Sequence, residues 1–506
     1  MTHPDPHAVP TRSERHRIAI ACTVSLVFLM QGIDTTILTV AIPGIAADLQ
    51  RSPLSLHLLV SAYLLALAVF MPVASWFSDR LGPRRLFCLS VLIFMAGSVL
   101  TAFMPTLGLM IPCRMLQGFG GALMTPVGRL IVLRAFGPGR TIDAMTWLAI
   151  PTMVGPLIGP LLGAVLVEMF DWRLLFVVNT PLAIAAILGV LRLVPPLPAV
   201  AAGRFDTRGF LLAGLALVTF QLAIEALGLW GGIGLTLLPV SALVFWVYTR
   251  HARTREKPAL DISLFHFENF RIGVLAGGLG RAGLNAMAFL LPLFLQLGLG
   301  FRPLQAGLIS ALAAFSSLAS KPVLKHVIRR LGFRRTLVAL TVAGSLSLAA
   351  YATVSTGWPV MALVGMSFLA GAVRILYFNS VQSITFTGLP AERLSSATAT
   401  AGVIQQLCMG LGISLSAALL SALQGEAAEV GMRDFNHAFL IMAVLPLLSL
   451  PLLMTRAGGR QEPAAAPLRK TNPEKENKSI GAIARSIETT TKAGERAPER
   501  ASDTAA

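Results

Sequence analysis

Residues 56–104 read LHLLVSAYLLALAVFMPVASWFS, DRLGPRR and LFCLSVLIFMAGSVLTAFM, which are two apolar runs (56–78 and 86–104) separated by a charged break (79–85). A helix needs about 20 mostly apolar residues to cross the hydrocarbon core of a bilayer, which is about 30 Å thick. Both runs have this length. The stretch therefore predicts two consecutive membrane-spanning helices joined by a short polar loop.

Apolar runs of this kind recur along the whole chain. Of the 506 residues, 55% are hydrophobic and only 13% are charged, and the mean hydropathy is +0.72, whereas soluble domains have about 25% charged residues. We therefore predict an all-α membrane protein with fourteen spans. They fall at about 18–45, 56–78, 86–104, 107–133, 142–167, 174–193, 209–229, 232–249, 272–298, 305–328, 335–356, 359–388, 398–422 and 436–455.

The basic residues support this number of spans. Of the 41 lysines and arginines, 32 fall in segments that would face the cytosol and 4 in the opposite loops, and an excess on the cytosolic side is typical of membrane proteins. Membrane topology thus explains the net charge of +17, and no nucleic-acid partner is predicted. Both termini are expected in the cytosol, with an N-terminal tail at 1–17 and a disordered C-terminal tail at 458–506.

Several kinds of chemistry have no support in the sequence. The four cysteines lie singly in apolar segments, so neither a disulfide framework nor a metal site is predicted. No GxxxxGK[ST] motif occurs, which argues against ATP hydrolysis. We expect no enzyme activity and no cofactor. The expected energy source is an ion gradient, with the proton favoured and sodium as the alternative.

Two loops share a hexapeptide. RLGPRR (80–85) follows the second predicted span, and RLGFRR (330–335) follows the tenth. Transporters are often built from two related halves that leave such sequence echoes. We therefore predict two six-helix halves at 18–193 and 272–455, joined by two additional linking spans within 209–249.

Four motifs of the first half carry a family resemblance. They are IDTTILTVAIP (33–43), SWFSDRLGPRR (75–85), RMLQG (114–118) and GPLIGP (155–160). In this order they resemble the major facilitator superfamily, specifically its fourteen-span drug:proton antiporters (EmrB/QacA type) and most closely the MdtD-like group. Ser75 and Pro160 stand where glycine is commoner in the family.

The resemblance covers about residues 18–455, and it implies both a fold and a function. The implied fold is the major facilitator fold. The implied function is proton-coupled export of small amphipathic drugs across the bacterial inner membrane, with a small-molecule substrate, protons and the lipid bilayer as partners. A monomer would be sufficient for a cavity between two six-helix halves.

Asp34 and Arg114 are charged residues inside the first and fourth predicted spans. Both lie about 10–14 Å below the outer boundary at 1.5 Å per residue, so they can pair if their helices face one another. A charge within the membrane costs at least about 2.5–3.5 kcal/mol, which makes each a functional candidate. We predict that Asp34 takes up and releases a proton and that Arg114 tunes its proton affinity. A purely structural ion pair is the alternative.

The loop after the second span has two interpretations. Its charged residues and glycine would serve as cytosolic anchors, whereas the family resemblance implies a charge latch that gates the transporter. We favour the latch, which consists of Asp79, Arg80, Gly82, Arg84 and Arg85.

A small-residue face in the fifth span also has two interpretations. Gly155, Gly159 and Gly163 repeat at four-residue spacing, a pattern that lets helices approach closely, and Pro156 softens the backbone. This pattern fits plain helix packing, and it equally fits the antiporter hinge that the family motif implies.

The second half carries basic residues within its predicted spans. Arg281 and Arg374 lie in spans 9 and 12, and guanidinium groups bind carboxylates and phosphates in a bidentate manner. Together with Gln296 and Asn379 they are candidates for the substrate cavity, as Gln117 is in the first half; interhelical hydrogen bonds are the alternative for the two glutamines. The basic groups favour a second function, the export of a small organic anion or metabolite such as a carboxylate.

Overall fold

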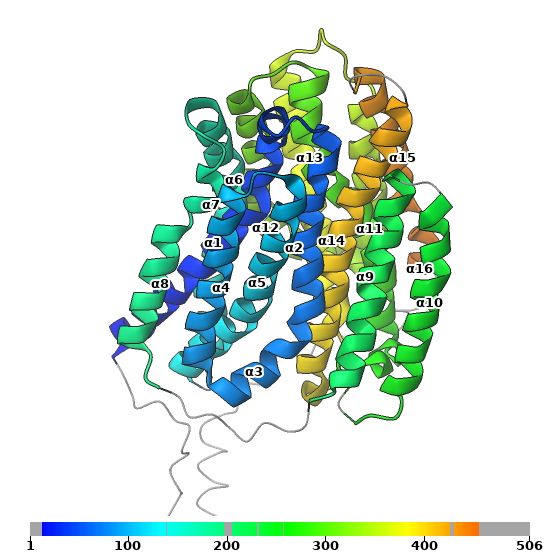
Figure 1. The fold of residues 1–506 in the computed structure, drawn as a ribbon. Coiled ribbons are helices and arrows are strands. Elements are labelled where there is room, and N and C mark those ends of the chain that lie inside the picture. The colour runs from blue at the N-terminus through cyan, green and yellow to red at the C-terminus, as the bar shows by residue number, and fades with distance from the viewer. Residues whose placement is uncertain are drawn as a thin grey trace, which may run out of the picture. The chain divides into compact units, whose positions relative to one another are not determined.

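The computed structural model describes residues 13–137, 139–196, 205–229, 232–256, 258–425 and 430–454, so the predicted C-terminal tail and most of the N-terminal tail lie outside the described residues. Regular secondary structure within these ranges is entirely helical (Figure 1). The helices are α1 (Glu14–Asp48), α2 (His57–Phe70), α3 (Ala74–Leu81), α4 (Pro83–Phe103), α5 (Leu107–Phe136), α6 (Thr141–Met169), α7 (Leu174–Val177), α8 (Thr180–Leu193), α9 (Thr207–Leu229), α10 (Gly232–Ala252), α11 (Glu268–Leu293), α12 (Pro303–Tyr351), α13 (Val360–Phe386), α14 (Leu394–Gln424), α15 (Met432–Leu447) and α16 (Leu450–Met454).

The fourteen predicted apolar runs are helical in the structure. Among the described residues, eleven helical stretches are long and apolar enough to cross a membrane. The three other predicted runs coincide with α10 and with the two parts of α12 on either side of Gly332. The prediction of an all-α, multi-pass membrane protein is therefore confirmed.

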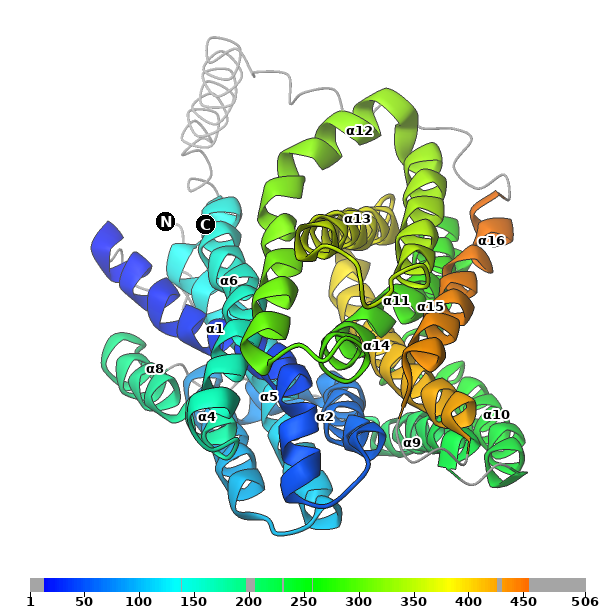
Figure 2. The same ribbon diagram turned by 90° about the horizontal axis from the view of Figure 1, so that it is seen from above.

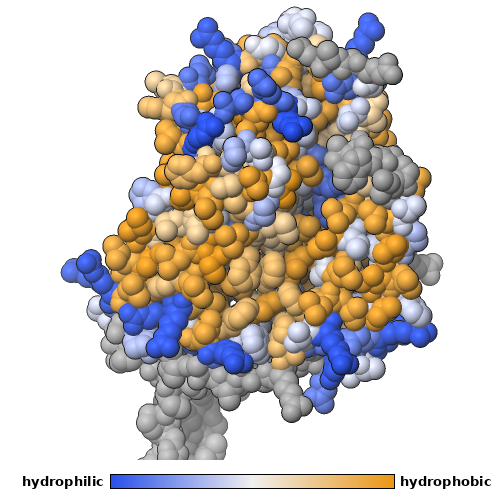
Figure 3. Space-filling model, viewed as in Figure 1, coloured by the Kyte–Doolittle hydropathy of each residue, from blue (hydrophilic) through white to orange (hydrophobic). Residues whose placement is uncertain are grey.

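Apolar side chains cover the sides of the bundle. Figure 3 shows them as a broad belt, with strongly hydrophilic residues gathered toward both ends of the visible face. Leu211, Leu346 and Leu369 are each more than half exposed, although they belong to long apolar helices. Exposure of this kind is expected where the surrounding solvent is lipid rather than water.

The helices fall into two groups joined by a linking pair (Figure 2). The N-terminal group, α1–α8, meets the C-terminal group, α11–α16, where α6 packs on α12, α2 on α14 and α1 on α11. The linking pair α9–α10 packs through α9 on α14 and α2. We call the end of the bundle with Glu14 and Arg140 the near end, and the end with Asp48 and Trp172 the far end.

The repeated hexapeptide adopts the same backbone conformation in both groups. Gly82 separates α3 from α4 at φ 78° and ψ 144°, and Gly332 interrupts α12 at φ 75° and ψ 162°. Only glycine adopts such positive φ values without strain. The repeat in the sequence is thus also a repeat in the structure.

The arginine two residues after each glycine makes an equivalent contact. Arg84 Nη2 donates to the carbonyl of Leu191, at the end of α8, over 2.5 Å. Arg334 Nε donates to the carbonyl of Leu453, in α16, over 3.1 Å. Each arginine thereby binds an orphan carbonyl at the C-terminus of the last helix of its own group, where a positive charge is favourable.

Candidate functional site

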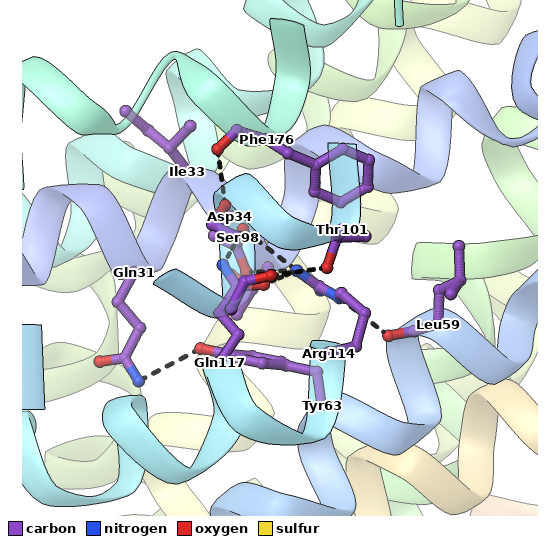
Figure 4. A network of polar contacts seen from close by, with 12 residues as sticks. Gln31, Ile33, Asp34, Leu59, Tyr63, Ser98, Thr101, Arg114, Gln117 and Phe176 are labelled. Carbon is purple, nitrogen blue, oxygen red and sulfur yellow. Dashed lines mark hydrogen bonds and ion pairs between the residues drawn. The ribbon is translucent and has the colours of Figure 1, made fainter. Parts of the chain in front are cut away.

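A buried charged cluster lies between α1 and α5 in the N-terminal group (Figure 4). Asp34, Arg114 and Gln117 are 2%, 1% and 0% exposed. Arg114 Nη1 donates to both carboxylate oxygens of Asp34, over 3.2 and 3.1 Å, and Gln117 Nε2 donates to Oδ1 of Asp34 over 2.8 Å. Gln117 Oε1 accepts a bond from Arg114 Nη1 as well. The structure thus brings together Asp34 and Arg114, which were predicted to handle the proton, and Gln117, which was predicted to be a polar contact of the substrate cavity or an interhelical hydrogen bond.

Neighbouring groups fix the position of Arg114. Its Nε donates to the carbonyl of Leu59, in the first turn of α2, over 3.1 Å. The guanidinium carbon lies 4.8 Å from the ring centre of Tyr63 and 5.9 Å from that of Phe176. Cation–π contacts of this kind are strongest where water is excluded. Arg114 therefore joins α1, α2 and α5 as well as neutralising Asp34.

A second set of polar contacts continues from this cluster along α1. Thr125 Oγ1 donates to Gln31 Oε1 over 2.5 Å, and Gln31 Nε2 faces the hydroxyl of Tyr63 over 3.4 Å. None of these three residues was predicted from the sequence. Gln31 could have been found, because it lies three residues before Asp34 and hence on the same face of α1.

A central cavity of about 80 Å³ lies between the two groups of helices. Its walls come from α1, α6, α11, α12 and α13. Thr35 and Thr36, the residues that follow Asp34, are among the lining residues, so α1 carries the charged cluster and one wall of the cavity. Arg374 also lines this cavity, and among the described residues it has no hydrogen-bond or ion-pair partner.

The other predicted cavity residues lie elsewhere. Arg281 is 7% exposed and lines a separate small cavity between α11, α13 and α14. Its Nη2 donates to the carbonyl of Phe378 over 3.3 Å, and its guanidinium carbon lies 4.6 Å from the centre of the Phe378 ring. Gln296 lies in the π-helical turn Phe294–Gly298 that follows α11, and its Nε2 donates to the carbonyl of Val40 on α1 over 2.9 Å. Asn379 is half-buried on α13 and lines neither cavity.

The predicted hinge residues face α1. A Cβ atom on Gly155 would lie 2.8 Å from the Cα of Gly32, and one on Gly163 would lie 2.5 Å from the carbonyl oxygen of Ile37. Real Cβ atoms do not approach so closely, so glycine is required for this contact between α6 and α1. Gly159 also packs on α1, and Pro156 lines the central cavity.

The predicted latch residues lie at the near end. Asp79 is exposed, and within the described ranges it forms no ion pair. Arg80 lies over the ring of Trp76 at 5.3 Å, Arg85 is exposed, and Gly82 and Arg84 make the turn and the helix-end contact described above. The structure therefore assigns structural contacts to three of the five residues and leaves the acid of the predicted latch unpaired.

Comparisons with known proteins agree on one family. The family model described as the Major Facilitator Superfamily matches residues 24–413 and 274–493. The chain is 36% identical to the "Putative multidrug resistance protein MdtD" of Citrobacter koseri, over 85% of this chain and 92% of that protein. It is 35% identical to the protein of the same name from Cronobacter sakazakii, with the same two shares covered.

Solved transporter structures share the fold. The POT family transporter PepTSo matches with a TM-score of 0.64 at 13% identity, covering 87% of this chain and 99% of that chain. The nucleoside transporter NupG matches with a TM-score of 0.57 at 15% identity, covering 87% and 99%. The family model, the relatives and the shared helical fold all indicate a transporter rather than an enzyme. The chain belongs to the major facilitator superfamily.

Proposed function

We propose that the protein is a proton-coupled antiporter that exports small amphipathic compounds across the bacterial inner membrane, with both termini in the cytosol. The observation that carries the proposal is the buried carboxylate of Asp34, which Arg114 and Gln117 hold on the same helix, α1, that also lines the central cavity. The multidrug-resistance names of the relatives support the proposed substrate class.

A proton and Arg114 compete for Asp34. A neutral carboxyl group no longer attracts a guanidinium group electrostatically, and its protonated oxygen becomes a donor instead of an acceptor. Loading Asp34 with a proton therefore weakens the link between α1 and α5. Thr35, Thr36 and Thr39 of α1 line the central cavity, so a shift of α1 changes the surface that the substrate contacts. Proton uptake and substrate release are linked in this way.

The near-end loop supplies a conformational latch in the same scheme. Asp79 is exposed and available for a partner in another arrangement of the two helix groups, while Gly82 and Arg84 hold the loop at the end of α8. Pairing of Asp79 would stabilise the arrangement in which the near end is closed. Asp79→Asn is then expected to slow transport while Asp34 still couples it to protons.

Transport in inverted membrane vesicles tests the main proposal. A fluorescent lipophilic cation is offered to vesicles with an imposed pH gradient, acidic inside, for the wild type and for Asp34→Asn. We expect gradient-driven accumulation in the wild type and its loss in Asp34→Asn at equal protein amount. Undiminished accumulation in Asp34→Asn would refute the proposed role of this carboxylate.

Arg374 supports a second candidate, the export of a small organic anion. Its guanidinium group faces the central cavity without a partner among the described residues, and a substrate carboxylate would supply one. The same vesicles, given a labelled tricarboxylate and the variant Arg374→Ala, separate the candidates. Carboxylate transport that disappears in Arg374→Ala would favour the anion exporter, whereas dye transport that persists in this variant favours the multidrug antiporter.

A further inference from the structure

A second buried polar cluster lies away from the central cavity. It consists of His57 at the start of α2, Gln221 and Glu225 on α9, and Ser414 on α14. These side chains belong to residues that are 4%, 4%, 7% and 0% exposed. The cluster therefore joins the N-terminal group, the linking pair and the C-terminal group at one point, where Figure 1 shows α2, α14 and α9 side by side.

The hydrogen bonds determine where the protons lie. His57 Nδ1 faces the carbonyl oxygen of Leu54 over 2.5 Å, and Nε2 contacts Oε2 of Glu225. A carbonyl oxygen can only accept, so Nδ1 carries a proton. The other carboxylate oxygen, Oε1, accepts bonds from Ser414 Oγ over 2.5 Å and from Gln221 Nε2 over 2.9 Å, which favours the ionised form of Glu225.

The contact between His57 and Glu225 needs one more proton than a neutral imidazole and a carboxylate carry together. With Glu225 ionised and Nδ1 already protonated, Nε2 must carry a second proton to bond to Oε2. Without that proton, the lone pair of Nε2 would face the lone pairs of a carboxylate in a buried site, and the contact would be repulsive. The contact therefore needs one additional proton, and the two hydrogen bonds that Oε1 accepts favour its place on Nε2 of His57.

Among the described residues, no other charged side chain bonds to His57 or Glu225. A cavity of about 120 Å³ reaches the pair, and its other lining residues are Ser52, Leu54, Ser55, Ala417, Ala418 and Ser421. From α11, the ring of Phe289 meets that of His57 edge-on at 6.3 Å. Among the described residues of the neighbouring elements, Arg51 precedes the pair on an exposed loop, Arg208 lies in the first turn of α9, and Arg393 directly precedes α14. Arg114 of α5 bonds to the carbonyl of Leu59, and its charge is paired with Asp34.

We propose that His57 and Glu225 form a proton-binding site separate from Asp34, and that the bound proton ties α2 to α9 and α14. The pair holds together while the site carries the additional proton, and it separates when that proton is lost. Ser52 and Ser55 belong to the segment between α1 and α2, so the cavity offers a route for the proton from the far end.

The two proton sites share the first turn of α2. Leu59, whose carbonyl accepts the bond from Arg114, lies two residues after His57. Movement of this turn when the His57–Glu225 pair separates therefore reaches Arg114 and, through it, Asp34. The existence of this proton-binding site does not depend on the proposed function. Its effect on export does rest on the proposed function.

Nitrogen-15 NMR of the full chain in lipid bilayers, labelled at histidine, tests the site directly. The chain has 8 histidines, and the signal that disappears in His57→Gln identifies His57. We expect the ring of His57 to hold protons on both nitrogens in the wild type at the pH of the measurement. In Glu225→Gln the same ring is expected to be neutral at that pH. A singly protonated His57 at every pH, or a spectrum unchanged by Glu225→Gln, would overturn the proposal.

Cysteine labelling tests the tie between helices at a fixed pH. Ser421→Cys is introduced into a chain whose native cysteines are replaced, and its reaction with a maleimide is timed with and without Glu225→Gln. Loss of the pair is expected to raise the labelling rate several-fold, whereas Ser310→Cys in the central cavity serves as the control and keeps its rate. Equal rates at Ser421→Cys would contradict the tie. Neither measurement depends on transport, so a failure of the proposed antiport would leave both results interpretable.

Discussion

Two charges that are out of water and bonded to each other make Asp34 and Arg114 energetically interdependent. Removing one partner of a buried ion pair costs about 3–5 kcal/mol, because the other charge remains buried and unpaired. We expect Arg114→Gln to lower the free energy of unfolding by about this amount. The double variant Asp34→Asn/Arg114→Gln should lose much less than the sum of the two single variants. Denaturant unfolding in mixed micelles measures the free energy of unfolding of the wild type, the two single variants and the double variant. Additive losses in this double-mutant cycle would show that the pair is not coupled.

The sequence revealed charged residues of the site more readily than neutral ones. Asp34 and Arg114 could be predicted because a carboxylate and a guanidinium group are rare inside apolar runs, and their distances from the span ends indicated equal depth. Tyr63 and Thr125 could not, since their polar groups cost little in a membrane helix and their sequence positions do not show which helix they face. His57 was missed for a similar reason: it begins an apolar run.

The contact between α1 and α6 depends on glycine at three positions of α6, 155, 159 and 163. Gly163→Val would place side-chain atoms against the backbone of Ile37, and overpacking of this kind costs about 1–3 kcal/mol. Gly365→Val on α13 is the matched control, because a Cβ there meets no atom within 4 Å. We expect a lower Tm for Gly163→Val than for Gly365→Val in the same detergent. Equal Tm values would mean that α6 can move away from α1 without cost.

The paired contacts of Arg84 and Arg334 predict local effects confined to one helix group each. Arg84→Ala should increase hydrogen exchange of the amides at the end of α8 and leave α16 unchanged, while Arg334→Ala should do the reverse. Each arginine binds the carbonyls of its own group only, so the effects should not cross. Mass spectrometry of peptic fragments measures both segments in one experiment. Exchange that rises at both ends in either variant would contradict the assignment.

The positions of the helices along the chain could be predicted from the sequence, whereas the helices that pack against each of them could not. The hexapeptide RLGFRR predicted a break in the middle of what is one long helical segment, and the positive φ of Gly332 accounts for it. The glycines of α6 predicted a close helix contact. Their spacing does not encode that α1 is the neighbour, because periodicity describes one face of one helix and carries no information on what covers it.

Across the whole molecule, transport by alternating access requires the two helix groups to separate at the far end. There, Glu168 of α6 accepts a bond from the amide of Leu304, the second residue of α12, over 2.8 Å. A short thiol cross-linker between Glu168→Cys and Leu304→Cys, in a chain without native cysteines, is expected to abolish transport until it is cleaved. The pair Asp48→Cys/Arg173→Cys, within the N-terminal group, should be cross-linked without this loss. Transport that survives the first cross-link would exclude opening at this contact.

The fourteen-run pattern was sufficient to predict the fold class, because the bilayer imposes one length and one polarity on every span. This pattern could not predict where the linking pair α9–α10 packs. α9 packs on α14 and α2, and Gln221 and Glu225 lie at this contact, but a polar residue in a span does not show which helix it faces.

The bond between Asp34 and Arg114 also sets an order of events during synthesis. Their positions differ by 80 residues, so the ribosome completes α1 well before α5 exists. During that interval α1 has entered the membrane with a carboxylate that has no partner, and its apolar residues alone must offset the cost. The position of α1 in the membrane is therefore less stable until α5 is inserted and Arg114 pairs with Asp34. A substitution that delays insertion of α5 will harm α1 as well, although no contact of α1 has been altered.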